Sequence, residues 1–101
     1  MKYFAVFFFV FISNVFFAQE KEKGTLINGI IKDDTTGNLL SGVNIINVNT
    51  VKGAISDDKG VFLLEAFAND TLHISLLGYK SIKVKVTNDW IKNKTTTILL
   101  S

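Results

Sequence analysis

Apolar residues along most of the chain come in short runs that are separated by Gly, Asn and Asp. Runs of four to eight residues that are rich in Ile, Val and Thr and recur about every ten residues are typical of strands in a sandwich or barrel. The pattern therefore predicts an all-β domain. The seven expected strands cover Leu26–Lys32, Val43–Val48, Ala54–Ser56, Val61–Glu65, Thr71–Leu76, Lys80–Val86 and Thr95–Leu100.

The sixth of these segments, KSIKVKV, shows the strand pattern most clearly. Ile82, Val84 and Val86 alternate with polar residues, so one face is expected to be buried and the other wet. We expect Lys83 and Lys85 to protect a sheet edge from pairing with other chains. The predicted core consists of Ile27, Ile31, Val43, Ile45, Ile55, Phe62, Leu64, Leu72, Ile74, Ile82, Val84, Val86, Ile98 and Leu100.

Two local features depart from this alternation. Gly29 lies inside the first strand, which indicates a bulge or a close backbone approach. The segment TNDWIKNK has helix-start signals, with Thr87 or Asn88 as the N-cap, and predicts a single helical turn. Trp90 in this turn either packs inward or stands exposed as a surface contact, and the sequence leaves both open.

The N-terminal segment differs from the rest of the chain. A short positive start is followed by an apolar run that ends at Ala18 and is shorter than the roughly 20 residues of a membrane-spanning helix. The pattern predicts a signal peptide over residues 1–18, then a polar lead over 19–25 and one domain over 26–101. An uncleaved anchor is the alternative, because Phe16 stands where a small residue is usual before the cleavage site.

The composition argues against several classes of function. The formal net charge is +2, and the sequence contains neither an arginine nor a block of basic residues, so nucleic-acid binding is not expected. There is no cysteine, which excludes disulfides and a lipid attachment through an N-terminal Cys. The domain must therefore be held together by its apolar core and by backbone pairing.

Two pairs of neighbouring aspartates are the main candidates for chemistry. Asp33–Asp34 and Asp57–Asp58 lie between expected strands, and a glycine comes shortly after each pair, in DDTTG and DDKG. Asp side chains accept backbone amides in turns, and Gly adopts positive φ angles there. A calcium site needs six to eight oxygen ligands from spaced carboxylates, and no such spacing is present. We predict turns, with Asp57 accepting amides of its own loop, and no metal or cofactor.

His73 is the only histidine and lies on the polar side of an expected strand. A zinc hydrolase needs two or three spaced ligands and a carboxylate base, and these are missing. The sequence has no G-x-S-x-G motif and no cysteine that would supply a nucleophile. We predict that the chain is not an enzyme, since catalysis would need groups from a second chain.

The segment LGYKS places Gly78 and Tyr79 between two expected strands. One interpretation is a hairpin turn in which the Tyr79 ring covers one end of the core and its hydroxyl bonds a backbone group. The other is an aromatic contact for a sugar or a protein. The first interpretation is favoured, because a single aromatic residue in a turn makes a weak site.

The order of these turn signals resembles the carboxypeptidase regulatory-like domain family. Asn49 stands where the family pattern has a glycine, and Asn tolerates positive φ better than most residues. The residues that match the family pattern are Gly29, Ile31, Asp33, Thr36, Gly37, Leu40, Gly42, Val43, Gly53, Asp57, Gly60, Phe62, Asp70, Thr71, Leu72, Ile74, Ser75, Gly78 and Tyr79.

The resemblance implies a seven-stranded, prealbumin-like Greek-key β-sandwich without catalytic residues, cofactor or metal. The residues to which it assigns a structural role in turns are Gly37, Gly42, Gly53, Asp57, Gly60, Gly78 and Tyr79. Similar domains stand alone or lead longer exported proteins and TonB-dependent receptors of the Bacteroidetes group. A chain that stops at TTTILLS is also consistent with a fragment of a longer protein.

Our leading hypothesis is an exported, non-catalytic module that contacts a protein partner in the cell envelope. Its expected location is the periplasm, the outer membrane or the exterior, with membrane contact only through the signal peptide or an associated receptor. The alternative is a carbohydrate-binding module, in which Trp90 or Tyr79 would contact a glycan.

Overall fold

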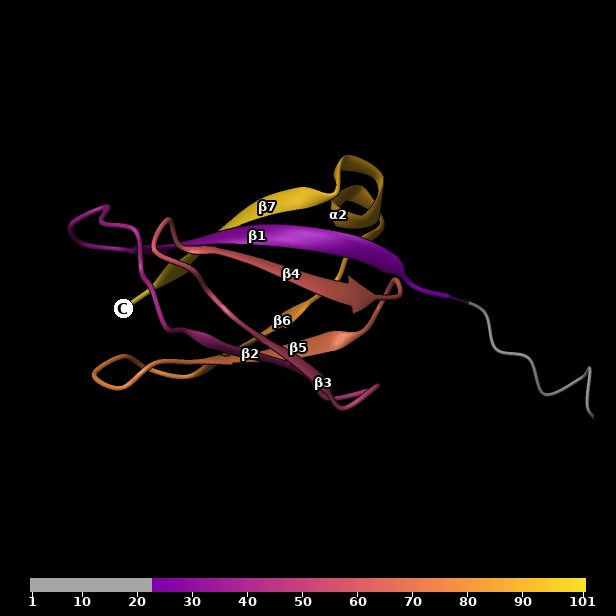
Figure 1. The fold of residues 1–101 in the computed structure, drawn as a ribbon, viewed down its shortest axis with the longest axis horizontal. Helices are drawn as coiled ribbons and strands as arrows, with labels where there is room; N and C mark the ends of the chain where they lie inside the picture. The colour runs from indigo at the N-terminus through magenta and orange to yellow at the C-terminus, as the bar shows by residue number, and fades with distance from the viewer. Residues whose placement is uncertain (1–22) are drawn as a thin grey trace, which may run out of the picture.

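The computed structural model describes residues 23–101. The predicted signal peptide and most of the polar lead lie outside the described residues. The described part contains seven strands and one short helix, arranged as two sheets that form separate layers (Figure 1). The elements are β1 (Thr25–Asp33), β2 (Asn44–Asn47), β3 (Lys52–Ile55), β4 (Val61–Ala66), β5 (Thr71–Ser75), β6 (Ile82–Lys85), α2 (Asn88–Asn93) and β7 (Thr95–Leu100).

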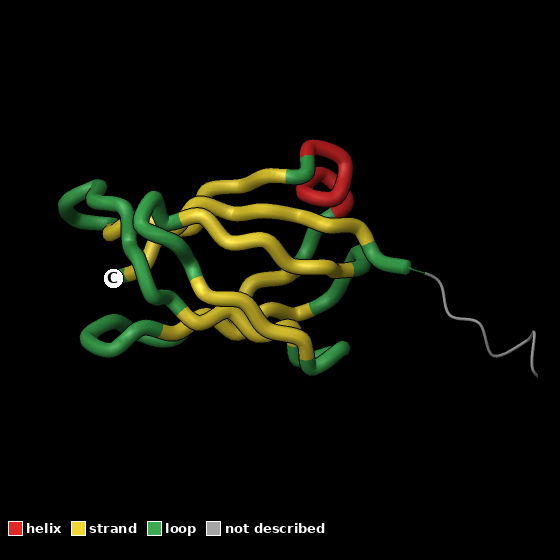
Figure 2. Tube along the Cα trace, viewed as in Figure 1, coloured by secondary structure: helices red, strands yellow, loops and turns green. Residues whose placement is uncertain are grey.

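The two sheets have the strand orders β4-β1-β7 and β3-β2-β5-β6. Every pair of neighbouring strands is antiparallel except β1 and β7, which are parallel and bring the first and last strands together. The chain crosses from one sheet to the other between β1 and β2, and loops gather at both ends of the sandwich (Figure 2). These features confirm the predicted seven-stranded, all-β prealbumin-like sandwich.

The core lies between the sheets and follows the alternation of the strands. In β5, Leu72 and Ile74 are buried and the residues on either side of each are only partly buried, so Leu72 and Ile74 point inward. Ile82 and Val84 are only partly buried, because β6 is an edge strand of its sheet. Ala66 also belongs to the core, although the sequence pattern did not indicate it.

The predicted burial of Ile55 is wrong. Its side chain is 66% exposed, because Ile55 pairs with Asn44 on the outer side of the sheet. Ala54 pairs with the buried Ile45 and takes the inward position instead. The strand covers Lys52–Ile55 rather than the predicted Ala54–Ser56. Its pairing register with β2 decides which side chains face the core, and this register turns Ile55 outward.

Gly29 allows a close approach between β1 and β4. Gly29 lies opposite Phe62 in an unbroken register, and a Cβ atom there would lie 2.5 Å from Cε1 of the Phe62 ring. The close approach predicted as one of two alternatives is therefore present, and the register shows no bulge. The Phe62 ring packs edge-on against Trp90, with ring centroids 6.3 Å apart.

The helix α2 brings Trp90 into the core. The Thr87 hydroxyl accepts a hydrogen bond from the Trp90 amide, which makes Thr87 the N-cap, and the turn ends at Lys94 with φ 65°. Trp90 is 5% exposed and is the buried residue of the helix. In the part of the chain that the structure describes, α2 is too short to cross a membrane and no other helix is a candidate span.

Candidate interaction surface

The first aspartate of each pair that the sequence singled out binds backbone amides in a turn. Asp57 Oδ1 accepts hydrogen bonds from the amides of Lys59 at 2.9 Å and Val61 at 3.0 Å. Asp33 Oδ1 accepts the Thr35 and Thr36 amides in the same manner. Residues 23–101 contain no group of three or more His, Cys, Asp or Glu side chains that could hold a metal ion.

The turn glycines differ in what they contribute. Positive φ angles occur at Gly37, Gly42, Gly60 and Gly78. A Cβ atom on Gly60 would also lie 2.6 Å from the Ile31 carbonyl oxygen, so this position combines a left-handed backbone with a close approach. Gly53 does not lie in a turn, since it belongs to β3.

The turn between β2 and β3 also differs from the expectation. Its positive φ falls on Val51, at 61°, and not on Asn49. A β-branched residue is rare in this region of backbone space. Asn49 Oδ1 instead accepts the Thr71 amide at 2.8 Å and so links this turn to the start of β5.

Tyr79 and Asp33 form a polar contact at one end of the sandwich. The Tyr79 hydroxyl donates to Asp33 Oδ2 at 2.6 Å, so its partner is a carboxylate and not the backbone group predicted from the sequence. The hydroxyl, followed by the Thr36 and Thr35 amides, lowers the pKa of Asp33 below its ordinary value. The same hydrogen bond, followed by partial burial, raises the pKa of Tyr79.

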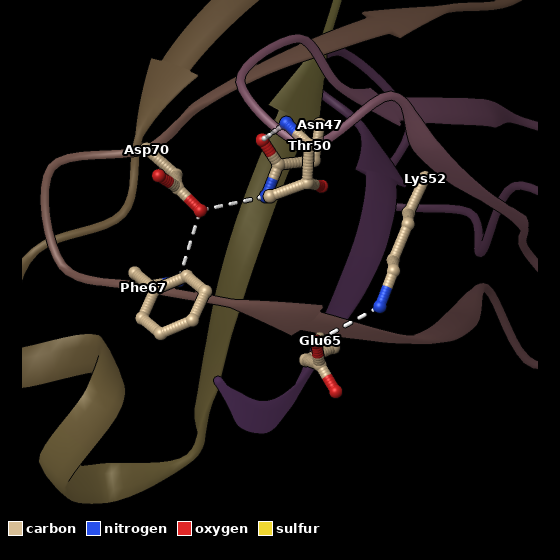
Figure 3. A network of polar contacts seen from close by, with 6 residues as sticks. All are labelled: Asn47, Thr50, Lys52, Glu65, Phe67 and Asp70. Atoms are coloured by element: carbon tan, nitrogen blue, oxygen red, sulfur yellow. Dashed lines mark hydrogen bonds and ion pairs between the residues drawn. The ribbon is translucent and has the colours of Figure 1, made fainter. Parts of the chain in front are cut away.

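A buried polar network joins the β2–β3 turn to the β4–β5 turn (Figure 3). Asn47 Nδ2 donates to Asp70 Oδ2 at 2.8 Å, and the same oxygen accepts the Phe67 amide at 2.9 Å. Asn47 Oδ1 accepts the amides of Asn49 and Thr50. This network was not predicted from the sequence. A polar Asn47 at an inward position of its strand is the signal that would have indicated it.

Neither aromatic candidate forms an exposed platform. Trp90 was left open as a surface contact, but it is 5% exposed and its Nε1 donates to the Asn28 carbonyl at 2.8 Å. It is buried because α2 turns the ring toward Phe62. Tyr79 is half-buried and its hydroxyl is occupied by Asp33. The carbohydrate-binding alternative therefore loses the two side chains on which it was based.

Exposed aliphatic side chains gather on the outer side of the four-stranded sheet. Ile46, Val48 and Ile55 are 44%, 49% and 66% exposed. Ile46 lies opposite His73 of β5, and His73 lies opposite Lys83 of β6. We refer to this surface, with Ile46, Val48 and Ile55 beside His73, Lys83 and Lys85, as the four-strand face. It offers an apolar centre with positive charge along one side.

Large apolar side chains also lie at separate points on the outer side of the three-stranded sheet. Leu26, Leu63 and Leu99 are 59%, 57% and 52% exposed, and they come from β1, β4 and β7. Their residues face outward because the intervening residues fill the core. Both outer faces therefore present large apolar side chains to solvent.

Comparison with known proteins places these features in a family. A family model for the CarboxypepD_reg-like domain matches residues 27–101. The chain belongs to this family. The matched residues cover all of the structure described above except the start of β1, so the whole sandwich is the CarboxypepD_reg-like domain.

The CarboxypepD_reg-like domain also resembles a receptor and a solved structure. It is 35% identical over 77 residues to the TonB-dependent receptor SusC of Bacteroides thetaiotaomicron, covering 76% of this chain and 7% of the receptor. It also matches a chain from the crystal structure of a type II cohesin–X-dockerin complex of Acetivibrio cellulolyticus, with a TM-score of 0.58 and 24% identity. That match covers 76% of this chain and 57% of the other, and it shows a shared fold. The chain thus spans a small part of the receptor and just over half of the structural neighbour.

Proposed function

We propose that the chain is an exported, non-catalytic module that works by protein contact in the cell envelope, together with a TonB-dependent receptor. The observation that carries this proposal is the 35% identity to the TonB-dependent receptor SusC over 76% of the chain. The apolar N-terminal segment over residues 1–18 supports export, because its length and polarity fit a signal peptide.

The use of the polar side chains supports a non-catalytic role. Asp33 and Asp57 accept two backbone amides each, and Asp70 is buried against Asn47. A carboxylate that is held in this way stabilises a turn and is not positioned to move a proton to or from a substrate. His73 lies between Ile46 and Lys83 on the four-strand face, with no carboxylate opposite it to orient the ring.

The four-strand face supports contact with a protein. Its apolar centre at Ile46, Val48 and Ile55 offers area that a partner can bury. Lys83 and Lys85 at its margin favour an acidic partner surface, since complementary charge speeds encounter and selects the partner. We assign the receptor contact to this face.

The first experiment tests export. Fractionation of cells that express the full chain is expected to place it in the periplasm, the outer membrane or the medium. Mass spectrometry of the purified protein is expected to find an N-terminus directly after Ala18. A chain that stays in the cytoplasm with its N-terminal segment intact would contradict the proposal.

The second experiment tests the partner. A photoreactive amino acid at Ile55 is expected to cross-link the chain to a TonB-dependent receptor in intact cells, since Ile55 is 66% exposed on the four-strand face. The same probe at Asp58, in the turn that follows β3, serves as the control. Equal cross-linking from both positions would contradict the assignment to this face, and the absence of any receptor adduct would contradict the proposed function.

A further inference from the structure

Strand β7 leaves one row of backbone groups without a partner strand. β7 is the last strand of the β4-β1-β7 sheet, so β1 is its only neighbour in the described part of the chain. The Asn28 amide donates to the Lys94 carbonyl at 2.8 Å, and successive residues of a strand direct their groups to opposite sides. The even-numbered residues of β7 therefore pair with β1. The amides and carbonyls of Thr95, Thr97 and Leu99 point to the open side.

The surroundings of β7 leave this side accessible. In Figure 1, the first half of β7 runs along the margin of the molecule beside α2, and at its other end the Lys80 amide donates to the carbonyl of Ser101, the residue after β7, at 2.8 Å. Thr95, Thr97 and Leu99 are exposed, whereas Ile98 and Leu100 are buried against the opposite sheet. The Ser101 carbonyl, next in this row, is occupied by Lys80, so the open row that a second strand can approach consists of Thr95, Thr97 and Leu99.

The other sheet edges carry charges that β7 lacks. On β6, Lys83 and Lys85 alternate with the apolar residues. On the opposite side of the sandwich, Lys52 at the start of β3 and Glu65 of β4 form an ion pair at 2.9 Å. Charged side chains discourage the pairing of edge strands, in particular when two like-charged strands would meet. β7, with the sequence TTTILL, has no charge, no Gly and no Pro.

The sequence of β7 is complementary to itself. When two copies place β7 antiparallel to β7 about a two-fold axis at Thr97, Thr97 lies opposite its own copy and Thr95 lies opposite Leu99. In each opposing pair, the backbone amide and carbonyl that point to the open side of one strand then form hydrogen bonds with those of the other strand. β-branched and apolar pairs of this kind stabilise a sheet, and no like charges oppose each other.

We infer that the open edge of β7 is a homodimerisation surface, at which two copies of this chain join their three-stranded sheets into one continuous sheet. A two-fold contact uses the open edge of both copies, so assembly ends at the dimer. The contact is one strand wide, and interfaces below about 1,200 Å² are usually weak and transient. We expect a dimer that dissociates on dilution to micromolar concentration.

Single cysteines provide a direct test, because the chain has no cysteine of its own. In the dimer the two Thr97 Cα atoms lie about 5.5 Å apart, which is within reach of a disulfide. The two Thr95 Cα atoms lie about 14–15 Å apart, beyond that reach, because they are offset by four residues along two neighbouring strands. Thr95→Cys on the same edge is therefore a matched control for Thr97→Cys.

The test is mild oxidation of both variants of the full chain, with non-reducing gel analysis over time. Thr97→Cys is expected to form a disulfide-linked dimer at least about tenfold faster than Thr95→Cys, given the difference in separation. Equal rates, or no dimer from Thr97→Cys at millimolar concentration, would overturn the inference. The unmodified protein is examined in parallel by sedimentation equilibrium, where monomer at all concentrations would overturn it as well.

A charge on the edge distinguishes edge pairing from contact through the apolar outer face. Thr97→Lys places two ammonium groups opposite each other in the dimer and is expected to leave only monomer. Leu63→Lys changes an exposed residue on the outer side of β4, at the opposite edge of the sheet from β7, and is expected to leave the dimer intact. Loss of the dimer in Leu63→Lys but not in Thr97→Lys would overturn the assignment to the edge.

This inference is independent of the proposed receptor contact. Dimerisation uses the β7 edge of the three-stranded sheet, whereas the receptor contact is assigned to the four-strand face. A protein that dimerises without cross-linking to a receptor would contradict the proposed function alone. A monomer that cross-links to a receptor would contradict the dimer alone.

Discussion

At the scale of single residues, the most demanding position is Gly29 in the middle of β1. The Phe62 ring occupies the space where any larger residue would place its Cβ atom. The ring is itself fixed, because it is 2% exposed and packs edge-on against Trp90. A substitution at Gly29 therefore has to displace part of the core.

Gly29→Ala is expected to lower the free energy of unfolding by about 1–3 kcal/mol, the usual cost of overpacking a core. The loss should be smaller in a Phe62→Leu background, because the ring atoms that the new methyl group would meet are then absent. Urea unfolding of the two single variants and the double variant measures this coupling. Gly53→Ala is the comparison, since its new Cβ atom would lie 3.3 Å from the Ile45 carbonyl oxygen, a tight contact but a longer one than the 2.5 Å at Gly29. Additive losses in the double-mutant cycle would contradict the packing account.

The contact between Tyr79 and Asp33 predicts a dependence on pH. Because the folded-state pKa of Asp33 is lowered, its stabilisation is present above its ordinary pKa and is lost as the pH falls through the lowered value. The raised pKa of Tyr79 has the opposite sign, so its contribution is present below its ordinary pKa and is lost as the pH rises through the raised value. The contact should therefore stabilise the fold between these two limits.

Tyr79→Phe is expected to raise the pKa of Asp33 toward its ordinary value, which carbon-13 NMR of the carboxyl group measures directly. The difference in stability between the two proteins should be largest near neutral pH and should shrink in acid. Asp33→Asn serves as the control, since it removes the titrating group. An Asp33 pKa that is the same in both proteins would show that the hydroxyl does not act on the carboxylate.

At the scale of elements, the sequence predicts the strands well where apolar and polar residues alternate. β5 lies close to its predicted bounds, because TLHIS alternates over its full length. β7 has its predicted bounds although TTTILL does not alternate, because its β-branched and apolar residues favour a strand. The prediction fails at β3, where the run is short and the partner strand sets the register, so that Ile55 faces outward. Trp90 is placed by a helix cap, which its own segment predicts, and by Phe62, which lies in another strand and cannot be read from that segment.

The side-chain contacts in the turns and the composition of the outer faces are harder to predict from the sequence than the strands are. The turn at Asp57 follows from its own sequence, because the amides that it binds lie within four residues. The network of Asn47 and Asp70 joins residues that are 23 positions apart, and only the fold brings them together. The two outer faces likewise depend on which strands become neighbours.

The Asn47 network yields a prediction about the turns that it joins. Asn47→Ala removes the amide donor to Asp70 and the acceptor for two backbone amides, so it is expected to cost about 1–3 kcal/mol. Asn44→Ala, at an exposed position of the same strand, is expected to change stability by less than about 0.5 kcal/mol. Urea unfolding measures both. Similar losses in the two variants would show that the network adds little.

At the scale of the whole molecule, one small apolar core has to stabilise both sheets without a disulfide. Phe62 is among the largest fully enclosed side chains and belongs to the central contact between the sheets. Domains of this size have a narrow margin of stability, because they bury a smaller share of their surface than larger domains do.

Phe62→Ala is expected to cost about 3–5 kcal/mol, which is a large share of the total stability of a small domain. Thermal unfolding followed by circular dichroism is expected to show a melting temperature lowered by well over 10 °C, as about 4–8 °C corresponds to each kcal/mol. Leu63→Ala on the outer face is the control, since that side chain is 57% exposed. A melting temperature within a few degrees of the parent would contradict the central role of Phe62.

The parallel pairing of β1 with β7 has a consequence for the timing of folding. β1 is the middle strand of its sheet, and β7 is the last of the described strands, so a chain that emerges N-terminus first lacks one side of that sheet until β7 is free. Contacts between such distant segments also form slowly, because a long loop has to close first. If the chain is exported as proposed, this sheet cannot be completed until β7 has left the translocation channel, so the domain is expected to fold on the far side.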